Sequence, residues 1–249
     1  VFIEAKSAIQ TFIRTLESFE FSVSRLNALV LSFFRRFAHL LRERFASDFQ
    51  QAIREAQHQP MIVNNGDELA KVLSVCWLKP GEADQLKQLP FPLSLPFSQT
   101  YPLCCMDIRS LVEQYYSFSS GMTQYHQDID LILTQSLDDL LIQQISINIR
   151  DTVEESTNLS QIAQIIVNIE HFQLACSELE RWLSESRTPN PGSRLALGAS
   201  EHLSTTLEIA QKRIDSAMFV KLDQFLDLLE YDWMPIQSAS MPVSYTHLR

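Results

Sequence analysis

Apolar residues recur three or four positions apart through most of the chain, a spacing that is typical of amphipathic helices. The clearest case is the segment 157–183, whose apolar positions share one side of a helix: Leu159, Ile162, Ile166, Ile169, Phe172, Cys176, Leu179 and Leu183. Asn158, directly before the first of these apolar positions, is a favourable N-cap residue. We expect a buried helix of roughly 40 Å, around which the other helices are arranged.

Residues 1–59 contain neither proline nor glycine, and their apolar residues follow a heptad rhythm. The positions with this spacing are Ile9, Phe12, Leu16, Phe19, Val23, Leu26, Val30, Phe33, Phe37 and Leu40. The series then continues in steps of four through Leu41, Phe45, Phe49 and Ile53. This pattern predicts one continuous helix over 1–59, roughly 85 Å long, whose seam drifts so that it changes its packing partner after Phe37.

Residues 60–101 form a different kind of segment. Pro60 ends the first helix, and a turn at 64–66 precedes a short helix expected from Asp67 to about Val75. The sequence LPFPLSLPFSQTYP at 89–102 places four prolines among apolar residues, which excludes a helix. Because it is too apolar for a free linker, we expect an extended connector packed on the bundle. A polyproline ligand is the alternative.

The remainder of the chain up to residue 235 predicts an antiparallel bundle. Periodic apolar positions indicate helices from Pro102 to near Gly121, from 129 to 145, over 157–183, and from 200 to 231. The polar stretch 151–156 and the TPNPG sequence at 188–192 interrupt them. Residues 236–249 follow no helical period, and we expect an irregular tail there.

Composition supports an elongated all-α rod. With 5 glycines in 249 residues, a phosphate-binding loop, a dinucleotide-binding fold and a glycine-rich β-fold are excluded. The net charge of -10 argues against nucleic acid as a partner. The first residues lack the apolar core of a signal peptide, and no uninterrupted apolar run of about 18 residues occurs. We therefore expect a cytoplasmic protein.

Candidate catalytic residues are few. The sequence DDLLI at 138–142 is similar to the DDxxD magnesium motif of isoprenoid synthases, but its fifth position is isoleucine. With Asp128 and Asp130 before it, the motif fits the solvated side of a helix better than a metal site. The 6 histidines show no HExxH spacing, His171 fits a helix surface, and no GxSxG motif occurs. We expect no enzymatic activity, catalytic residue, cofactor or metal ion.

Three other groups of residues fit more than one role. Arginines at 35, 36, 42 and 44 alternate with phenylalanines at 33, 34, 37 and 45, which fits contact with anionic lipid or an ordinary solvent-facing side. Tyr231-Asp232-Trp233 fits an interface hot spot or aromatic packing at a helix end. The cysteines have no metal-ligand or disulfide spacing, so we expect buried thiols at Cys76, Cys104, Cys105 and Cys176.

Four features in their order along the chain resemble the Sec-fifteen subunit of the exocyst, the vesicle-tethering complex. They are LPFPLSLPFSQTYP, a helix ending at YYSFSSGM, the segment LSQIAQIIVNIEHFQLACSELERWL, and LEYDW. The similarity covers about residues 40–235. Each feature alone is a degenerate apolar pattern, and the shared order and spacing make the resemblance specific.

The resemblance implies the helical-rod architecture of multisubunit tethering proteins. It also implies a cytoplasmic protein recruited to secretory vesicles and the plasma membrane, with only indirect membrane contact. Its partners would be other exocyst subunits and a GTP-bound Rab GTPase, at residues that remain unassigned. In the family the helices continue beyond LEYDW and carry the Rab contact. We therefore expect that this chain is truncated, that MPVSYTHLR is a foreign tail, and that Rab binding is weak.

Two other functions fit parts of the sequence. A coiled-coil or spectrin-like cytoskeletal scaffold would bury similar helical seams, but it has no need for the apolar proline-rich connector. An all-α isoprenoid-diphosphate enzyme would use the aspartates at 138–139, and it should be stabilised by magnesium and ligand.

Overall fold

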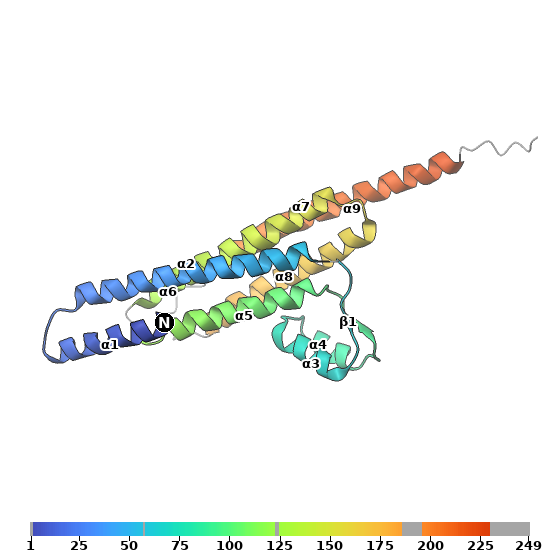
Figure 1. Ribbon diagram of the computed structural model, residues 1–249. Coiled ribbons are helices and arrows are strands. Elements are labelled where there is room, and N and C mark those ends of the chain that lie inside the picture. The colour runs from blue at the N-terminus through green and yellow to red at the C-terminus, as the bar shows by residue number, and fades with distance from the viewer. Residues whose placement is uncertain (1, 57, 123–124, 186–195, 230–249) are drawn as a thin grey trace, which may run out of the picture.

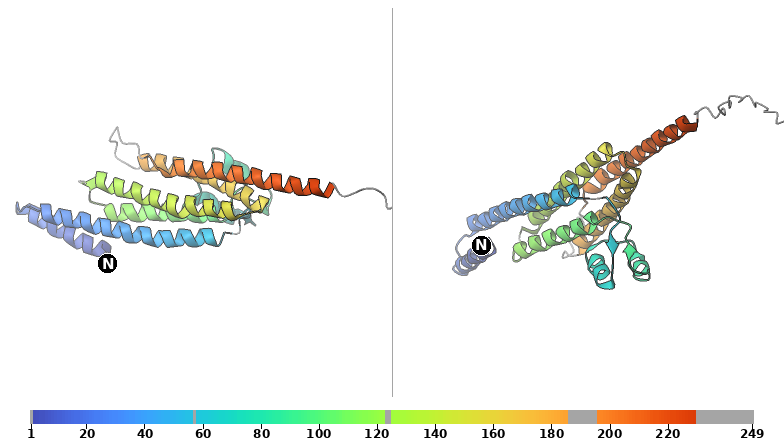
Figure 2. Two further views of the ribbon diagram at one scale, coloured as in Figure 1. Left: turned by 90° about the horizontal axis from the view of Figure 1, so that it is seen from above. Right: turned by 45° about the vertical axis from the view of Figure 1, so that its right-hand side comes forward.

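The computed structural model describes residues 2–56, 58–122, 125–185 and 196–229. Helices make up 80% of this described part, and a two-stranded ribbon is its only sheet. The long helices lie side by side in an elongated bundle (Figures 1 and 2), so the predicted all-α fold is confirmed. The division of the chain into four segments as separate domains stays a prediction.

Two helices, α1 (Phe2–Ser18) and α2 (Ser24–Arg54), replace the continuous helix predicted for 1–59. They form an antiparallel hairpin at one end of the bundle (Figure 1). The buried residues of α2 are Val30, Phe34, Ala38, Leu41, Phe45, Phe49 and Ile53. The buried positions from Leu41 onward are those that the sequence predicts. Phe33 and Leu40 are not buried, because the buried positions of α2 already follow in steps of four after Val30.

The turn between α1 and α2 is a Schellman-type C-cap. The Phe21 N–H donates to the Leu16 carbonyl at 3.1 Å, and the Glu20 N–H donates to the Glu17 carbonyl at 3.0 Å. Glu20 adopts φ 60°, the left-handed conformation that glycine adopts more readily. The turn is therefore made without glycine or proline, and the heptad spacing runs through it unbroken.

A small unit lies beside the bundle (Figure 1). It contains β1 (Ile62–Val63), α3 (Gly66–Val75), α4 (Glu82–Lys87) and β2 (Leu93–Ser94), and the two strands pair antiparallel. The Asn65 side chain caps α3 by accepting a 2.9 Å hydrogen bond from the Glu68 N–H. The short helix predicted from Asp67 is confirmed, while the ribbon and α4 were not predicted.

The proline-rich connector packs on the bundle, as predicted. Leu95 and Phe97 are buried, at 1% and 0% exposure. Phe91, another apolar residue of the connector, is instead 40% exposed. Because Leu95 and Phe97 are buried, the connector does not present them for binding by another protein. This disfavours the alternative that the connector is a polyproline ligand.

Two amide side chains of α8 (Leu159–Glu185) hold the backbone of this connector. The Asn168 Oδ1 accepts from the Ser98 N–H at 2.9 Å, and the Gln164 Nε2 donates to the Pro96 carbonyl at 2.9 Å. Asn168 and Gln164 are themselves buried. The strand pairing of β2 with β1 leaves the Pro96 carbonyl and the Ser98 N–H without strand partners, and these amides supply the partners that burial requires.

The remaining helices are α5 (Thr100–Ser119), α6 (His126–Asp139), α7 (Ile147–Glu155) and α9 (Ala199–Leu229). A π-helical segment, η2 (Leu140–Ser146), joins α6 and α7 into one run. The break predicted at 151–156 is therefore wrong in its extent, because α7 continues to Glu155 and only Ser156 is extended. Polar residues on the solvent side of α7 explain the apparent interruption.

Helix α8 has the buried face that its sequence predicts. The seam residues Ile162, Ile169, Phe172, Cys176, Leu179 and Leu183 are buried, and the Asn158 side chain accepts from the Ser160 N–H at 3.0 Å at its start. It packs against α5, α7 and α9, while α2 packs against α1, α5, α6 and α7. The central position predicted for α8 is therefore shared with α2.

Candidate protein-interaction surface

The two halves of α9 differ in burial. In the first half Leu203, Thr206 and Ala210 are buried where the helix packs on α7 and α8. From 218 to 228 every residue is exposed. Figure 1 shows this second half running out beyond the other helices of the bundle.

Polar contacts fix the first half of α9 in place. At its start the Asp138 Oδ1 accepts a 3.0 Å hydrogen bond from the Ala199 N–H, a helix N-terminus that favours a carboxylate. Further along, the hydroxyl groups of Ser146 and Thr206 lie 2.8 Å apart. Together they orient the helix along η2 and the end of α6.

The exposed half of α9 carries a broad apolar face. Its exposed apolar residues are Met218, Phe219, Val220, Leu222, Phe225, Leu226 and Leu228, each 49% to 68% accessible. Five of them, all but Val220 and Leu228, gather on one side of the helix. At about 100° per residue, the middle of this side is turned roughly 110° from the line of Leu203 and Ala210 that faces the bundle. Phe225 follows Leu207, which packs on the core, by five full turns, so the exposed face meets the packed side of the helix at one edge and extends beyond it.

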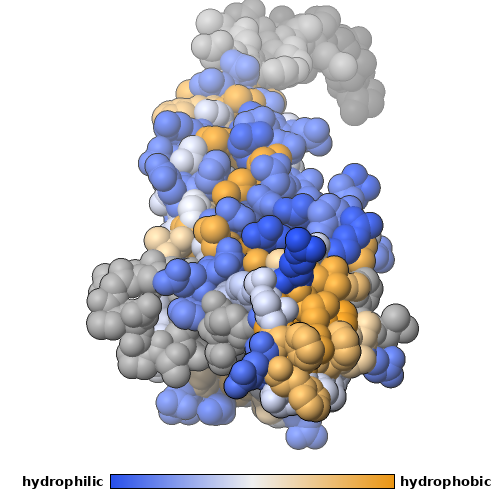
Figure 3. Space-filling model, turned by 90° about the vertical axis from the view of Figure 1, so that its left-hand side faces the viewer, coloured by the Kyte–Doolittle hydropathy of each residue, from blue (hydrophilic) through white to orange (hydrophobic). Residues whose placement is uncertain are grey.

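A second apolar surface lies at the opposite end of the molecule, at the α1–α2 hairpin. Phe12, Phe19 and Phe21 are 55%, 69% and 63% exposed. Figure 3 views this end and shows hydrophobic residues gathered beside charged ones. The sequence pattern assigned Phe12 and Phe19 to a buried seam, an expectation that is wrong because the chain turns at Glu20.

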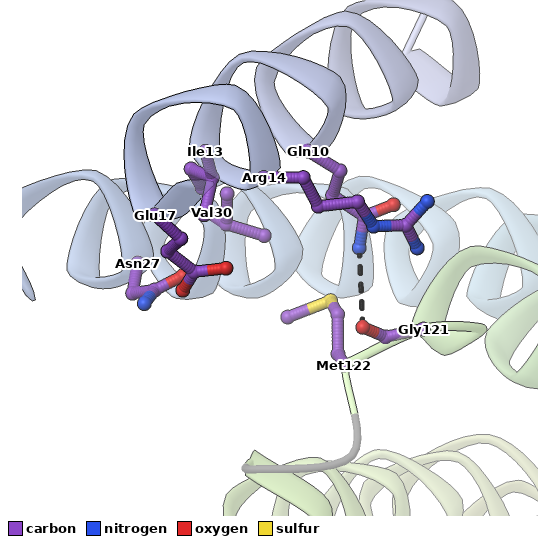
Figure 4. Close-up of a pocket in the computed structure, with 8 residues that line it drawn as sticks. All are labelled: Gln10, Ile13, Arg14, Glu17, Asn27, Val30, Gly121 and Met122. Carbon is purple, nitrogen blue, oxygen red and sulfur yellow. Dashed lines mark hydrogen bonds between the residues drawn. The ribbon is translucent and has the colours of Figure 1, made fainter. Parts of the chain in front are cut away.

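A small cavity lies behind this hairpin (Figure 4). Its volume is about 140 Å³, and it is lined by Gln10, Ile13, Arg14, Glu17, Asn27, Val30, Gly121 and Met122. The Gln10 Nε2 donates to the Gly121 carbonyl at 3.4 Å across it. The cavity has the size of a few water molecules, and its side chains show no arrangement for catalysis.

The two aspartates at 138–139 have structural partners. Asp138 caps α9, and Asp139 forms an ion pair with Arg42 of α2. Asp128 lies 3.8 Å from Arg35. Across the described ranges, no group of three or more His, Cys, Asp or Glu residues could hold a metal ion. These acids therefore lie along a side of the helix and also make specific contacts with α2 and α9.

His171 is buried, at 5% exposure, so its predicted place on the helix surface is wrong. Its ring packs edge-on against Phe97 and Tyr101, with centroids 5.1 and 5.3 Å away. The Nδ1–H donates to the Val167 carbonyl at 2.8 Å, and Nε2 lies 3.5 Å from a Glu82 carboxylate oxygen. The folded connector covers this side of α8, which the periodicity of α8 alone could not indicate.

The aromatic residues between the α2 arginines are not free for lipid. Phe34 and Phe45 are buried, and Phe37 stacks on Phe118 with centroids 4.3 Å apart. The arginines therefore form a solvent-facing side of α2, in part paired with α6. None of the helices described is long and apolar enough to span a bilayer.

All four cysteines are buried and free, as expected. Burial, together with the nearby Glu180 and Asp138, raises the pKa of the Cys176 thiol to about 12. Such a thiol stays protonated at neutral pH and is a poor nucleophile. The last sequence candidate, Tyr231-Asp232-Trp233, lies outside the described residues.

Comparison with known proteins gives a consistent set of relatives. The chain is 27% identical over 237 residues to "Exocyst complex component SEC15" of Saccharomyces cerevisiae, covering 93% of this chain and 26% of that protein. It is 25% identical over 248 residues to "Exocyst complex component 6" of Rattus norvegicus, covering 98% and 30%. For "Exocyst complex component sec15" of Schizosaccharomyces pombe the values are 25% over 243 residues, 94% and 31%.

The chain thus spans about a quarter to a third of the length of these curated relatives. No solved structure matches it significantly. The model of the family "Exocyst complex subunit Sec15 C-terminal" matches residues 25–247, which include most of the segment expected to be a tail. Because this match covers nearly the whole chain, the chain belongs to the C-terminal family of the exocyst subunit Sec15.

Proposed function

We propose that this chain is part of a vesicle-tethering subunit and acts as a stiff helical arm that holds partner surfaces apart. The observation that carries the proposal is the exposed half of α9, which extends from the bundle with a broad apolar face. Contiguous exposed apolar surface of this kind usually marks a protein contact. Membership in an exocyst family supports other exocyst subunits as the proteins that make it.

The proposal includes a GTP-bound Rab GTPase as a second partner, which recruits the subunit to secretory vesicles, while other subunits link it to the plasma membrane. We place the Rab contact outside residues 1–249, so this chain alone binds Rab at most weakly. The arm performs no catalysis. The structural roles of Asp138 and Asp139 support this, because neither carboxylate is free to share a magnesium ion.

The test uses the full-length protein, captured from cells that lack the endogenous copy. We expect the wild-type protein to recover the other exocyst subunits. Changing Leu222 and Phe225 together to Asp should reduce their recovery at least tenfold, because two charges then interrupt the apolar face. The matched control changes the exposed Phe12 and Phe21 to Asp at the other end of the bundle.

Recovery that falls only in the α9 variant supports the proposal. Equal recovery from both variants and the wild type would assign the contact to another surface, and a wild type that recovers no exocyst subunit would overturn the function itself. The same capture with GTP-locked Rab proteins tests the second partner. Micromolar or tighter binding of a Rab by the 249-residue chain would contradict the placement of its contact.

A further inference from the structure

The π-helical segment η2 lies where the helical run from α6 to α7 changes its packing partners. α6 packs against α2 and α5, whereas α7 packs against α9 as well as α2 and α8 (Figure 1). η2 itself contacts both α2 and α9. π-helical turns are rare and occur mostly as single bulges inside α-helices. The position of η2 therefore connects the bulge with the change of partners.

The buried residues of η2 show what the wider turn achieves. They form two adjacent pairs, Leu140–Leu141 and Ile145–Ser146, which follow each other at a spacing of five residues. Residues five apart lie roughly 140° apart around an α-helix, so these four side chains would be spread over more than half of its circumference. Hydrogen bonds at the i to i+5 spacing widen the turn and bring both pairs onto one side. η2 therefore accommodates one residue more than α-helical spacing allows.

The contacts with α9 indicate the same extra residue. The Asp138 Oδ1 accepts from the Ala199 N–H at 3.0 Å, and the hydroxyl groups of Ser146 and Thr206 lie 2.8 Å apart. The order of these contacts shows that the α6–α7 run and α9 point in the same direction. Asp138 and Ser146 are eight positions apart, but Ala199 and Thr206 are seven positions apart. Over nearly the same length, the run through η2 thus uses one residue more than α9 does.

Asn148 supports the end of the π-helical turn. The Ile147 N–H donates to the Ile142 carbonyl, five positions earlier. When the spacing returns to four residues in α7, one carbonyl is passed over by the backbone donors. The Asn148 Nδ2 donates to the carbonyls of Gln143 at 3.2 Å and Gln144 at 2.8 Å. This side chain therefore supplies a donor where the backbone ladder changes its spacing.

We infer that η2 is a register device, which absorbs one extra residue so that a single helical run packs on α2 before it and holds α9 after it. A shift of one residue would turn α7 by about 100°. The buried Ile149 and Val153 would then leave the core. The Ser156 carbonyl would also move away from Arg213, which donates two hydrogen bonds to it. Because η2 absorbs the residue, α7 keeps the register in which it holds α9.

The experiment removes the extra residue. Deletion of the exposed Gln143 turns the i, i+5 pairs of η2 into i, i+4 pairs, so an α-helical turn can replace the bulge while α6 and α7 keep their buried faces. The Tm of the 249-residue chain should stay within about 2 °C of the wild-type value or rise. The matched control deletes the exposed Asp151 from the regular helix α7, which turns Val153 and Ser156 away from their partners. Its Tm should fall by at least about 6 °C.

Two substitutions give measurements that do not depend on the control. Asn148→Ala should lower the Tm of the wild-type chain, because the carbonyls at the end of η2 lose a donor. The same substitution should not lower the Tm of the Gln143 deletion, in which the regular ladder passes over no carbonyl. Arg213→Ala should destabilise both chains equally, since Ser156 keeps its place in both.

The inference would be overturned if the Gln143 deletion lost more than half as much Tm as the Asp151 deletion, or if the Asp151 deletion were as stable as the wild type. An equal effect of Asn148→Ala in both chains would also contradict it, as would Arg213→Ala without effect in the Gln143 deletion. Circular dichroism should show undiminished helix in the Gln143 deletion, and a loss of helix would mean that α6 or α7 had lost its register.

Discussion

The guanidinium group of Arg213 donates two hydrogen bonds, of 3.1 and 2.9 Å, to the carbonyl oxygen of Ser156. Ser156 is the C-cap of α7, where carbonyl groups lack helical partners and the helix dipole is negative. Arg213 is half-buried, and the fully exposed part of α9 begins five residues later at Met218. This contact therefore ties down the helix just before it leaves the bundle.

Arg213→Ala should lower the free energy of unfolding by about 1–2 kcal/mol, since a charge-assisted hydrogen bond is lost at a helix end. Arg213→Lys should recover part of this loss, because an ammonium group can donate but cannot reproduce the guanidinium fork. Urea denaturation measures the change, with the exposed neighbour Lys212→Ala as control. Equal effects at both positions would show that the Ser156 contact contributes nothing.

Asn168→Leu should destabilise the protein by about 2 kcal/mol, because the buried Ser98 N–H loses its acceptor. The loss is local to the connector, so protease cleavage between 89 and 101 should accelerate more than global unfolding does. Glu170→Leu, on the exposed side of the same helix, is the control. Unchanged cleavage in the Asn168 variant would mean that apolar packing alone holds the connector.

Periodicity predicted the long helices well because each buries one face on its neighbours, as α8 does through Phe172 and Leu183. It could not predict where α1 ends, since Glu20 occupies a position for which glycine is the usual signal. His171 was misplaced for another reason. Its burial depends on a connector distant in sequence, and only the folded arrangement of Phe97 and Tyr101 covers it.

The candidate surface was only partly predictable. The sequence places Phe219, Val220 and Leu228 beside the periodic apolar positions of α9, which is more than one partner face can cover, but it does not show where the helix leaves the bundle. That point depends on the lengths of its neighbours: α7 ends at Glu155, and the chain turns back into α8 near Arg213. Beyond this turn α9 has no neighbour among the described helices.

Glu20→Gly should raise the free energy of unfolding by about 1 kcal/mol, because glycine adopts positive φ without the steric cost paid by other residues. Ser22→Gly is the matched control, since its φ is not positive and glycine there only adds freedom to the unfolded chain. Thermal and urea unfolding should therefore move in opposite directions for the two variants. Stabilisation by both would refute the assignment of strain to Glu20.

We expect the free energy of unfolding to fall as the pH is lowered, and His58 to be one cause. Burial lowers the pKa of this imidazole below its ordinary value, and its Nδ1 has no hydrogen-bond partner. The unfolded chain therefore takes up a proton at a higher pH than the folded one. The folded state loses stability as pH falls from about 6.5 towards the lowered pKa.

His58→Asn should reduce this loss, and asparagine tolerates the φ of 46° found there. Unfolding free energies at about pH 7.5 and pH 5.5 give the comparison, with the exposed His202→Asn as control. A pH dependence that is unchanged in the His58 variant, or reduced equally in the control, would assign the effect to other groups.

The 249-residue chain alone should self-associate through α9, because Leu222 and Phe225 are exposed without a partner helix. Residues 214–228 carry three acids and Lys221, so two copies repel each other. Raising the salt concentration from about 50 to 500 mM shortens the range of this repulsion and should strengthen the association. Sedimentation velocity should show a monomer for Leu222→Gln with Phe225→Gln, while Phe12→Gln with Phe21→Gln should still associate. A wild-type chain that stays monomeric at about 100 µM in high salt, or that dissociates as salt rises, would contradict the apolar contact.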